Sequence, residues 1–74
     1  MATVEQAIGK SDVVELTEAV HRTEGVGKWP AGTTGTVVED YGDRKVVEIP
    51  CHCGGIEDFL TVPIEQLKLI DKHS

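Results

Sequence analysis

Apolar and polar residues alternate along most of the chain after Asp12, and this period of two predicts β-strands. Val14, Leu16 and Val20 share one face of the opening strand, while Glu18 interrupts that face and indicates that the strand bends or ends there. Because Glu, Leu and Ala also favour helices, a short helix is the competing interpretation of this segment.

Three segments further along the chain are rich in β-branched residues and bounded by turn signals, so they predict three more strands. These strands are expected at residues 33–41, 45–49 and 56–62. The turns between them are expected at Gly42-Asp43 and at residues 51–55, which contain the pair Gly54-Gly55. The pattern therefore predicts two successive hairpins.

The remaining segments complete the expected topology. Residues 21–32 form a long connection punctuated by glycine and proline. Residues 63–66 are expected to form one helical turn with Pro63 at its first position, followed by a last short strand at residues 67–70. Because so few short strands cannot bury two faces as an open sheet, closure into a barrel is favoured. The sequence thus predicts an all-β fold, a small five-stranded SH3-like antiparallel barrel over residues 12–71 with one short helical turn before the last strand.

The two ends and the core follow from this assignment. Residues 1–11 are expected to form an N-terminal tail or short helix, and residues 72–74 a C-terminal tail. The expected core consists of Val14, Leu16, Val20, Val37, Val47, Ile49, Leu60, Val62, Ile64, Leu67 and Leu69. A core this small leaves folding near the margin, since ordering each residue costs roughly 1.5 kcal/mol. Dimerisation is therefore one expected source of further burial.

A family resemblance rests on three stretches of the chain. They are Asp12-Val13-Val14-Glu15-Leu16, the segment from Pro30 to Glu39, and Leu60-Thr61-Val62-Pro63, and the shorter matches Tyr41-Gly42-Asp43, Val47-Glu48-Ile49 and Leu67 accompany them. Together they resemble the small bacterial family called domain of unknown function 4926, which implies a stand-alone SH3-like barrel and no particular activity. The resemblance covers roughly residues 12–70, and its most specific part is the segment from Pro30 to Glu39, where Gly32 and Gly35 would allow a turn and a close strand crossing. The segment Cys51-His52-Cys53-Gly54-Gly55 departs from it, because an acidic turn is expected there.

The net charge of the chain and the placement of its basic residues disfavour two classes of binding partner, nucleic acids and anionic membranes. The chain carries 13 acidic and 7 basic residues, a net charge of −6, and its basic residues are scattered. Phosphate binding needs clustered Lys and Arg, so nucleic acid is not an expected partner. The net negative charge also argues against docking on an anionic membrane surface. The chain has no apolar stretch of membrane-spanning length and no basic start followed by an apolar run, so a cytoplasmic location is expected.

The cluster Cys51-His52-Cys53 is the most chemically suggestive motif. In an extended strand the two cysteines point to one side and His52 to the other, so a tetrahedral zinc would need further ligands from His21, His73 or a second subunit. A disulfide between the cysteines is not expected, because side chains two apart in a strand diverge. A redox-responsive thiol pair is the other chemical alternative. The interpretation that we favour from sequence is a hairpin turn with two incidental thiols.

Other motifs do not predict an enzyme or a cofactor. Gly25-Val26-Gly27-Lys28 lacks the spacing of a phosphate-binding loop. The carboxylates Glu39, Asp40, Asp43, Glu57 and Asp58 are interpreted as solvated turn residues. No serine or cysteine has an evident His–acid set, so no catalytic residues and no cofactor are predicted.

Trp29 is the leading candidate for contact with a partner, because it lies in the long first loop and tryptophan is enriched at binding hot spots. Lys28 and Tyr41 are the other candidate contacts. The competing interpretation is that Trp29 covers one end of the barrel as a lid. The sequence therefore predicts a non-catalytic protein-interaction module, accessory, inhibitor or antitoxin-like, that binds a protein partner or itself. The alternative is a metal- or redox-responsive module built on Cys51, His52 and Cys53.

Overall fold

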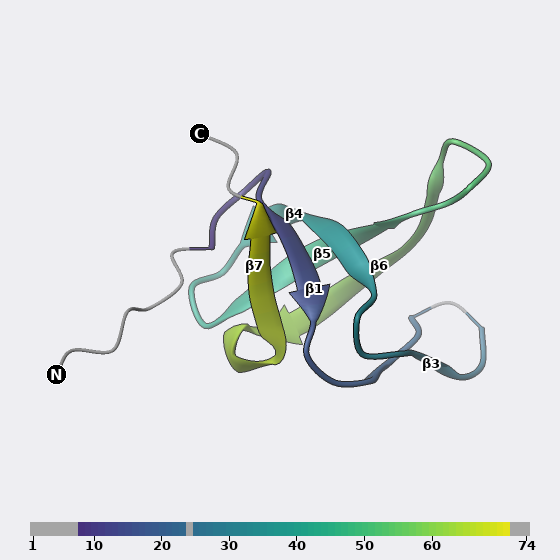
Figure 1. Cartoon of the computed structure of the whole chain (residues 1–74), viewed down its shortest axis with the longest axis horizontal. Helices are drawn as coiled ribbons and strands as arrows, with labels where there is room; N and C mark the ends of the chain where they lie inside the picture. Colours follow the sequence, from purple (N-terminus) through teal and green to yellow (C-terminus); the bar gives the residue numbers. More distant parts are fainter. Residues whose placement is uncertain (1–7, 24, 72–74) are drawn as a thin grey trace, which may run out of the picture.

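The computed structural model describes residues 8–23 and 25–71, and its main element is a five-stranded antiparallel sheet (Figure 1). Its strands follow the order β6-β5-β4-β1-β7. They are β1 (Val13–Leu16), β4 (Thr34–Asp40), β5 (Arg44–Pro50), β6 (Ile56–Pro63) and β7 (Leu67–Asp71), with the 3-10 helix η1 (Ile64–Gln66) before β7. The two predicted hairpins, the helical turn and the last strand are thus confirmed. Of the predicted N-terminal tail or short helix at residues 1–11, residues 1–7 lie outside the described residues, as does the predicted C-terminal tail at residues 72–74.

The opening strand and the long connection differ from the sequence prediction. The strand ends at Leu16, before Glu18, and Val20 belongs to the separate strand β2 (Val20–His21). This strand pairs with β3 (Lys28–Trp29), so part of the predicted loop is a small hairpin of its own. We call residues 20–29, of which all but residue 24 are described, the arm.

The hydrophobic core lies on one face of the sheet. Its buried residues are Ile8, Val14, Leu16, Val37, Val47, Ile49, Leu60, Val62 and Leu67. Most of the predicted core is confirmed, while Val20, Ile64 and Leu69 are partly buried and pack against its side. Ile8, which the sequence placed in a tail or short helix, is 5% exposed, so the core begins before Asp12.

A closed ring of hydrogen-bonded strands is not found among the described residues, because no pairing joins the outer strands β6 and β7. The sheet nevertheless contributes residues from all five strands to one core. In Figure 1, β1 and β7 run steeply while β5 and β6 run on a diagonal, which displays the strong twist of this sheet. The structure establishes a mostly β protein with one antiparallel sheet.

At Gly35, β4 lies so near β5 that no side chain would fit. A Cβ atom at this position would lie 2.6 Å from the carbonyl oxygen of Glu48 and 2.6 Å from a methyl carbon of Val47. The close strand crossing expected at Gly35 is therefore confirmed. Gly32 has φ +93°, which confirms the expected turn.

Three charged residues extend the rows of inward-facing side chains. Asp12, Lys45 and Asp58 are 1%, 4% and 3% exposed. Each stands two positions before a core residue, namely Val14, Val47 and Leu60, so the period of two directs it to the same face. Burial of a charge requires partners, and those of Asp58 include two residues of the arm, Thr23 and Trp29.

Candidate functional site

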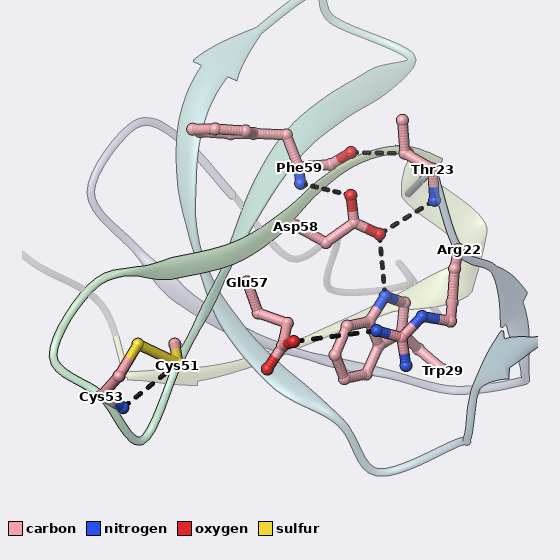
Figure 2. A network of polar contacts seen from close by, with 8 residues as sticks. All are labelled: Arg22, Thr23, Trp29, Cys51, Cys53, Glu57, Asp58 and Phe59. Atoms are coloured by element: carbon pink, nitrogen blue, oxygen red, sulfur yellow. Dashed lines mark hydrogen bonds and ion pairs between the residues drawn. A yellow bond between two sulfur atoms is a disulfide. The ribbon is translucent and has the colours of Figure 1, made fainter. Parts of the chain in front are cut away.

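The carboxylate of Asp58 on β6 holds the arm on the sheet by hydrogen bonds (Figure 2). Asp58 Oδ2 accepts hydrogen bonds from the indole Nε1 of Trp29 and from the backbone N–H of Thr23, both at 2.9 Å. Its Oδ1 accepts the backbone N–H of Phe59 at 2.9 Å. The Thr23 hydroxyl in turn donates to the Phe59 carbonyl at 2.7 Å. The buried carboxylate thus has several donors, which compensates the loss of hydration.

These bonds cover part of the outer edge of β6. β6 is an outer strand of the sheet, and Phe59 on it carries one backbone N–H and one C=O. Asp58 and Thr23 satisfy both groups. The arm therefore protects an edge strand at this point, as edge strands require.

Arg22 adds a second contact between the arm and β6. Its guanidinium carbon lies 4.3 Å from the centre of the Trp29 ring, and one of its nitrogens lies 3.8 Å from Glu57 Oε2. In Figure 2 the guanidinium overlies the indole ring, and a dashed line joins it to Glu57. Both side chains of the ion pair are partly exposed, so the pair contributes little compared with Asp58.

The tip of the arm presents an apolar side chain to solvent. Val26 is 97% exposed. It stands between Gly25 and Gly27, whose φ angles of +84° and +104° suit glycine and form the tip. The backbone N–H of Arg22 donates to the Gly27 carbonyl at 3.1 Å, and this bond closes the hairpin next to its tip.

The structure separates the three residues that the sequence grouped as partner contacts. The Trp29 ring packs against the core and donates to Asp58, which matches the lid interpretation. Lys28 is exposed beside it on β3. Tyr41 is 63% exposed in the turn between β4 and β5. Trp29 and Lys28 thus belong to the arm, and Tyr41 belongs to another surface.

Tyr41 lines a shallow groove of about 360 Å³ with Asp43, Arg44 and Thr61. An adjoining hollow of about 300 Å³ extends it to Pro63 and Glu65. The groove is open and mixes polar and apolar walls.

The prediction that Cys51 and Cys53 do not form a disulfide is wrong, because the structure joins them in one. The segment is a turn, closed by the bonds Cys51 N–H to Gly55 O at 2.9 Å and Gly54 N–H to Cys51 O at 3.0 Å. Side chains two apart in such a turn need not diverge, and the Cα atoms are 5.1 Å apart, within the range of disulfides.

The disulfide also bears on the predicted metal site at Cys51, His52 and Cys53. Neither sulfur is a thiolate, which is the form that binds metals. His52 is exposed, and residue 73 lies outside the described part of the chain. Within residues 8–23 and 25–71, no three His, Cys, Asp or Glu side chains are grouped to hold a metal ion. The structure does not bring this site together.

The interpretation of the acidic residues as solvated is wrong for Asp58. Asp58 occupies the inward row of β6 with Leu60 and Val62, and that row was the sequence signal for its burial. Asp40 has a different environment at the end of β4. Its Oδ1 accepts from the Lys45 ammonium and, at 2.8 Å, from the Gly42 N–H. The hydrogen bond from the Lys45 side chain is the main cause that lowers the pKa of Asp40 below its ordinary value of 3.8. The hydrogen bond from the Gly42 N–H is the second cause.

Val26, Thr23 and Asp58 are the residues of this site that sequence reasoning missed. The segment Gly25-Val26-Gly27 was considered only as a phosphate loop, although two glycines around one apolar residue also fit a hairpin tip. Thr23 has no comparable signal, because its partners are 35 and 36 positions away along the chain.

Comparison of this chain with family models, curated proteins and solved structures finds no match. The resemblance to domain of unknown function 4926 therefore stays a prediction. In the part of the chain that the structure describes, no helix has the length and apolar character to cross a membrane.

Proposed function

We propose that the chain is a non-catalytic protein-interaction module of SH3-like architecture, and that the tip of its arm makes the central contact. The architecture is supported by the order of elements, namely a first strand, a long connection, two hairpins, a 3-10 turn and a last strand. A shared core for all five strands of the sheet also supports it. An experimental structure with a flat sheet, exposed on both faces, would contradict the SH3-like assignment.

The observation that carries the binding proposal is the exposure of Val26. Fully burying a valine side chain is worth about 1.5–3 kcal/mol, so a partner that encloses Val26 gains affinity from this residue alone. The two flanking glycines have no side chains that would obstruct a partner. A small apolar side chain on a narrow tip fits a pocket better than a flat surface.

The hydrogen bonds that hold the arm on the sheet support the same proposal. Asp58 and Thr23 hold the base of the hairpin, so its tip is presented in one orientation. A contact that is ordered before binding loses less conformational entropy when the complex forms. The arm is therefore suited to recognition in a way that a free loop is not.

The proposed partner is a protein, or a second copy of this chain, with an apolar pocket for Val26 and a carboxylate that meets Lys28. Lys28 is exposed on β3, and the Arg22 guanidinium lies on the same hairpin. The excess of 13 acidic over 7 basic residues in the whole chain disfavours nucleic acid and anionic membranes as partners.

Site-specific photocrosslinking in cells of the source organism tests this proposal. A benzophenone amino acid at position 26 is expected to give a discrete crosslinked product, and Lys28→Glu in the same chain is expected to weaken that product several-fold. Position 70 is the matched control, because Ile70 is an exposed apolar residue, at 48%, on β7. Mass spectrometry of the product distinguishes another protein from a second copy.

The proposal is wrong if position 26 gives no discrete product, or if positions 26 and 70 give the same set of products. A product that consists of crosslinked nucleic acid would also contradict it. A product containing only this chain supports self-association, and sedimentation equilibrium should then detect a dimer that Val26→Asp dissociates.

A further inference from the structure

The tip of the β5–β6 hairpin carries chemistry that the binding proposal does not use. It is the turn of residues 51–55, and in Figure 1 the hairpin that bears it extends beyond the other strands of the sheet. The turn holds the disulfide between Cys51 and Cys53. Cys53 is exposed and Cys51 is half-buried, and neither belongs to the core.

This disulfide is poorly placed to stabilise the fold. A bridge between residues two apart closes a very short loop and removes little entropy from the unfolded chain. Two backbone hydrogen bonds, Cys51 N–H to Gly55 O and Gly54 N–H to Cys51 O, already close the same turn. The turn is therefore expected to keep its shape when the bridge is reduced, with the two thiols held near each other.

The surroundings make the two sulfurs unequal. Cys53 is exposed, and neither Gly54 nor Gly55 has a side chain that would shield its sulfur. A Cβ atom on Gly55 would lie in contact with Cys53 Sγ, at 3.9 Å. Cys51 Sγ instead accepts the backbone N–H of Cys53 at 3.1 Å. A thiolate formed on Cys51 would receive a charge-assisted hydrogen bond from that N–H. The geometry favours attack at Cys53, with Cys51 as the leaving group.

We propose that Cys51 and Cys53 form a thiol–disulfide exchange site for low-molecular-weight thiols of the glutathione class. A glutathione thiolate attacks Cys53 Sγ, a new sulfur–sulfur bond forms there, and the Cys51–Cys53 bond breaks with its electron pair on Cys51 Sγ. A second glutathione thiolate attacks the glutathione sulfur and releases glutathione disulfide and the Cys53 thiolate. Both cysteine thiolates then take protons from water, so the pair gains two electrons and two protons in total.

The reverse reaction uses the same groups. One thiolate of the reduced pair attacks glutathione disulfide and becomes linked to glutathione, and the other thiolate displaces that glutathione to restore the bridge. Because the turn holds the two sulfurs close together, the second step is intramolecular and fast. Mixed disulfides with glutathione are therefore short-lived in the intact pair.

Equilibration of the full chain with mixtures of reduced and oxidised glutathione tests the proposal. After an acid quench and alkylation, intact-mass spectrometry is expected to detect either no alkyl groups or two, with little of the singly modified form. Trp29, the single tryptophan of the chain, should keep its emission in both states, because its contacts lie outside the bridge.

Rapid quenching of the oxidised protein with reduced glutathione tests the assignment of the two sulfurs. Fragment spectra are expected to place glutathione on Cys53 at least about five-fold more often than on Cys51, because the accessible sulfur is attacked. Gly55→Val puts branched carbons beside Cys53 Sγ and is expected to slow reduction about five-fold. Ile70→Val, far along the chain on β7, is the control and should leave the rate unchanged.

Three results would overturn the proposal. The first is a pair that stays reduced in pure glutathione disulfide, and the second is a bridge that glutathione reduces only in denaturant. The third is loss of the fold on reduction, monitored by circular dichroism, since the bridge would then be a structural one. Equal labelling of the two cysteines would overturn the assigned order of attack.

Discussion

The sheet and the arm are held together by different interactions. The sheet packs apolar side chains such as Leu60 and Val62, each at most 1% exposed, into one core. The arm contributes Trp29 and Val20 to the margin of that core and depends on the hydrogen bonds of Asp58 for its position. Apolar packing is non-directional and stabilises the whole domain, whereas a carboxylate with defined donors sets the place and direction of one segment. The difference predicts that mutations in the two regions act on different properties.

Gly35→Ala should have the largest effect, because it acts on the sheet. The new Cβ would meet the Glu48 carbonyl oxygen at 2.6 Å, so the backbones of β4 and β5 must move apart. We expect the free energy of unfolding to fall by about 3 kcal/mol, measured by urea denaturation. Gly9→Ala is the control, since its nearest neighbour would be Asp12 Oδ2 at 4.0 Å, and an equal loss in both variants would contradict the close crossing.

Asp58→Ala should come next and should act on the arm. It removes the acceptor for the Trp29 indole and for the Thr23 and Phe59 amides, and we expect a loss of about 2 kcal/mol. The Trp29 emission should shift to the red, and amide exchange should accelerate in the arm more than in β4 and β5. Asp58→Asn retains one acceptor oxygen and should give an intermediate result. A red shift absent from both variants would show that the arm does not depend on Asp58.

Acid should act on the contact between Asp40 and Lys45 at the other end of the sheet. Because the hydrogen bond from Lys45 lowers the pKa of Asp40 below 3.8, the folded state binds this proton less readily than the unfolded state. The stabilisation that ionised Asp40 gives the folded state is therefore complete above pH 3.8, the ordinary pKa of this carboxyl. It is lost as the pH falls through the lower pKa that Asp40 has in the folded state. Asp40→Asn should be less stable than the natural chain at pH 6, and the difference should vanish at the acid end of a denaturation series. A difference that stays constant with pH would contradict this origin.

Arg22→Ala should have the smallest effect of the four. It removes a partly exposed contact with the Trp29 ring and an ion pair with Glu57 at 3.8 Å, together worth about 0.5–1 kcal/mol. Part of this loss should disappear in 1 M salt. Arg44→Ala is the control, because the pair Arg44–Asp43 is highly exposed, with side-chain exposures of 60% and 80%, and should contribute nothing measurable. A loss for Arg22→Ala as large as that for Asp58→Ala would mean that the surface contact, and not the carboxylate, positions the arm.

Much of the sheet could be predicted from the sequence because its signals are local. Alternation assigns Val47 and Ile49 to one face without knowledge of any neighbour, and Gly42 and Pro63 mark the ends of strands by their backbone preferences. The candidate site was less predictable. One of the hydrogen bonds that hold the arm on the sheet joins Thr23 to Asp58, which are 35 positions apart, and no short window of sequence contains both residues.

The sequence by itself determined the β class, the order along the chain of the five strands of the main sheet, most of the core and the turn at residues 51–55. Each of these depends on side-chain periodicity or on glycine and proline, which act over a few residues. Only the tertiary structure decided that Asp58 is buried, that Trp29 lies against the sheet, and that Cys51 and Cys53 are bridged. The physical reason is that burial of a charge depends on partners from distant segments, and that a bridge depends on the angle of a turn, which composition does not specify.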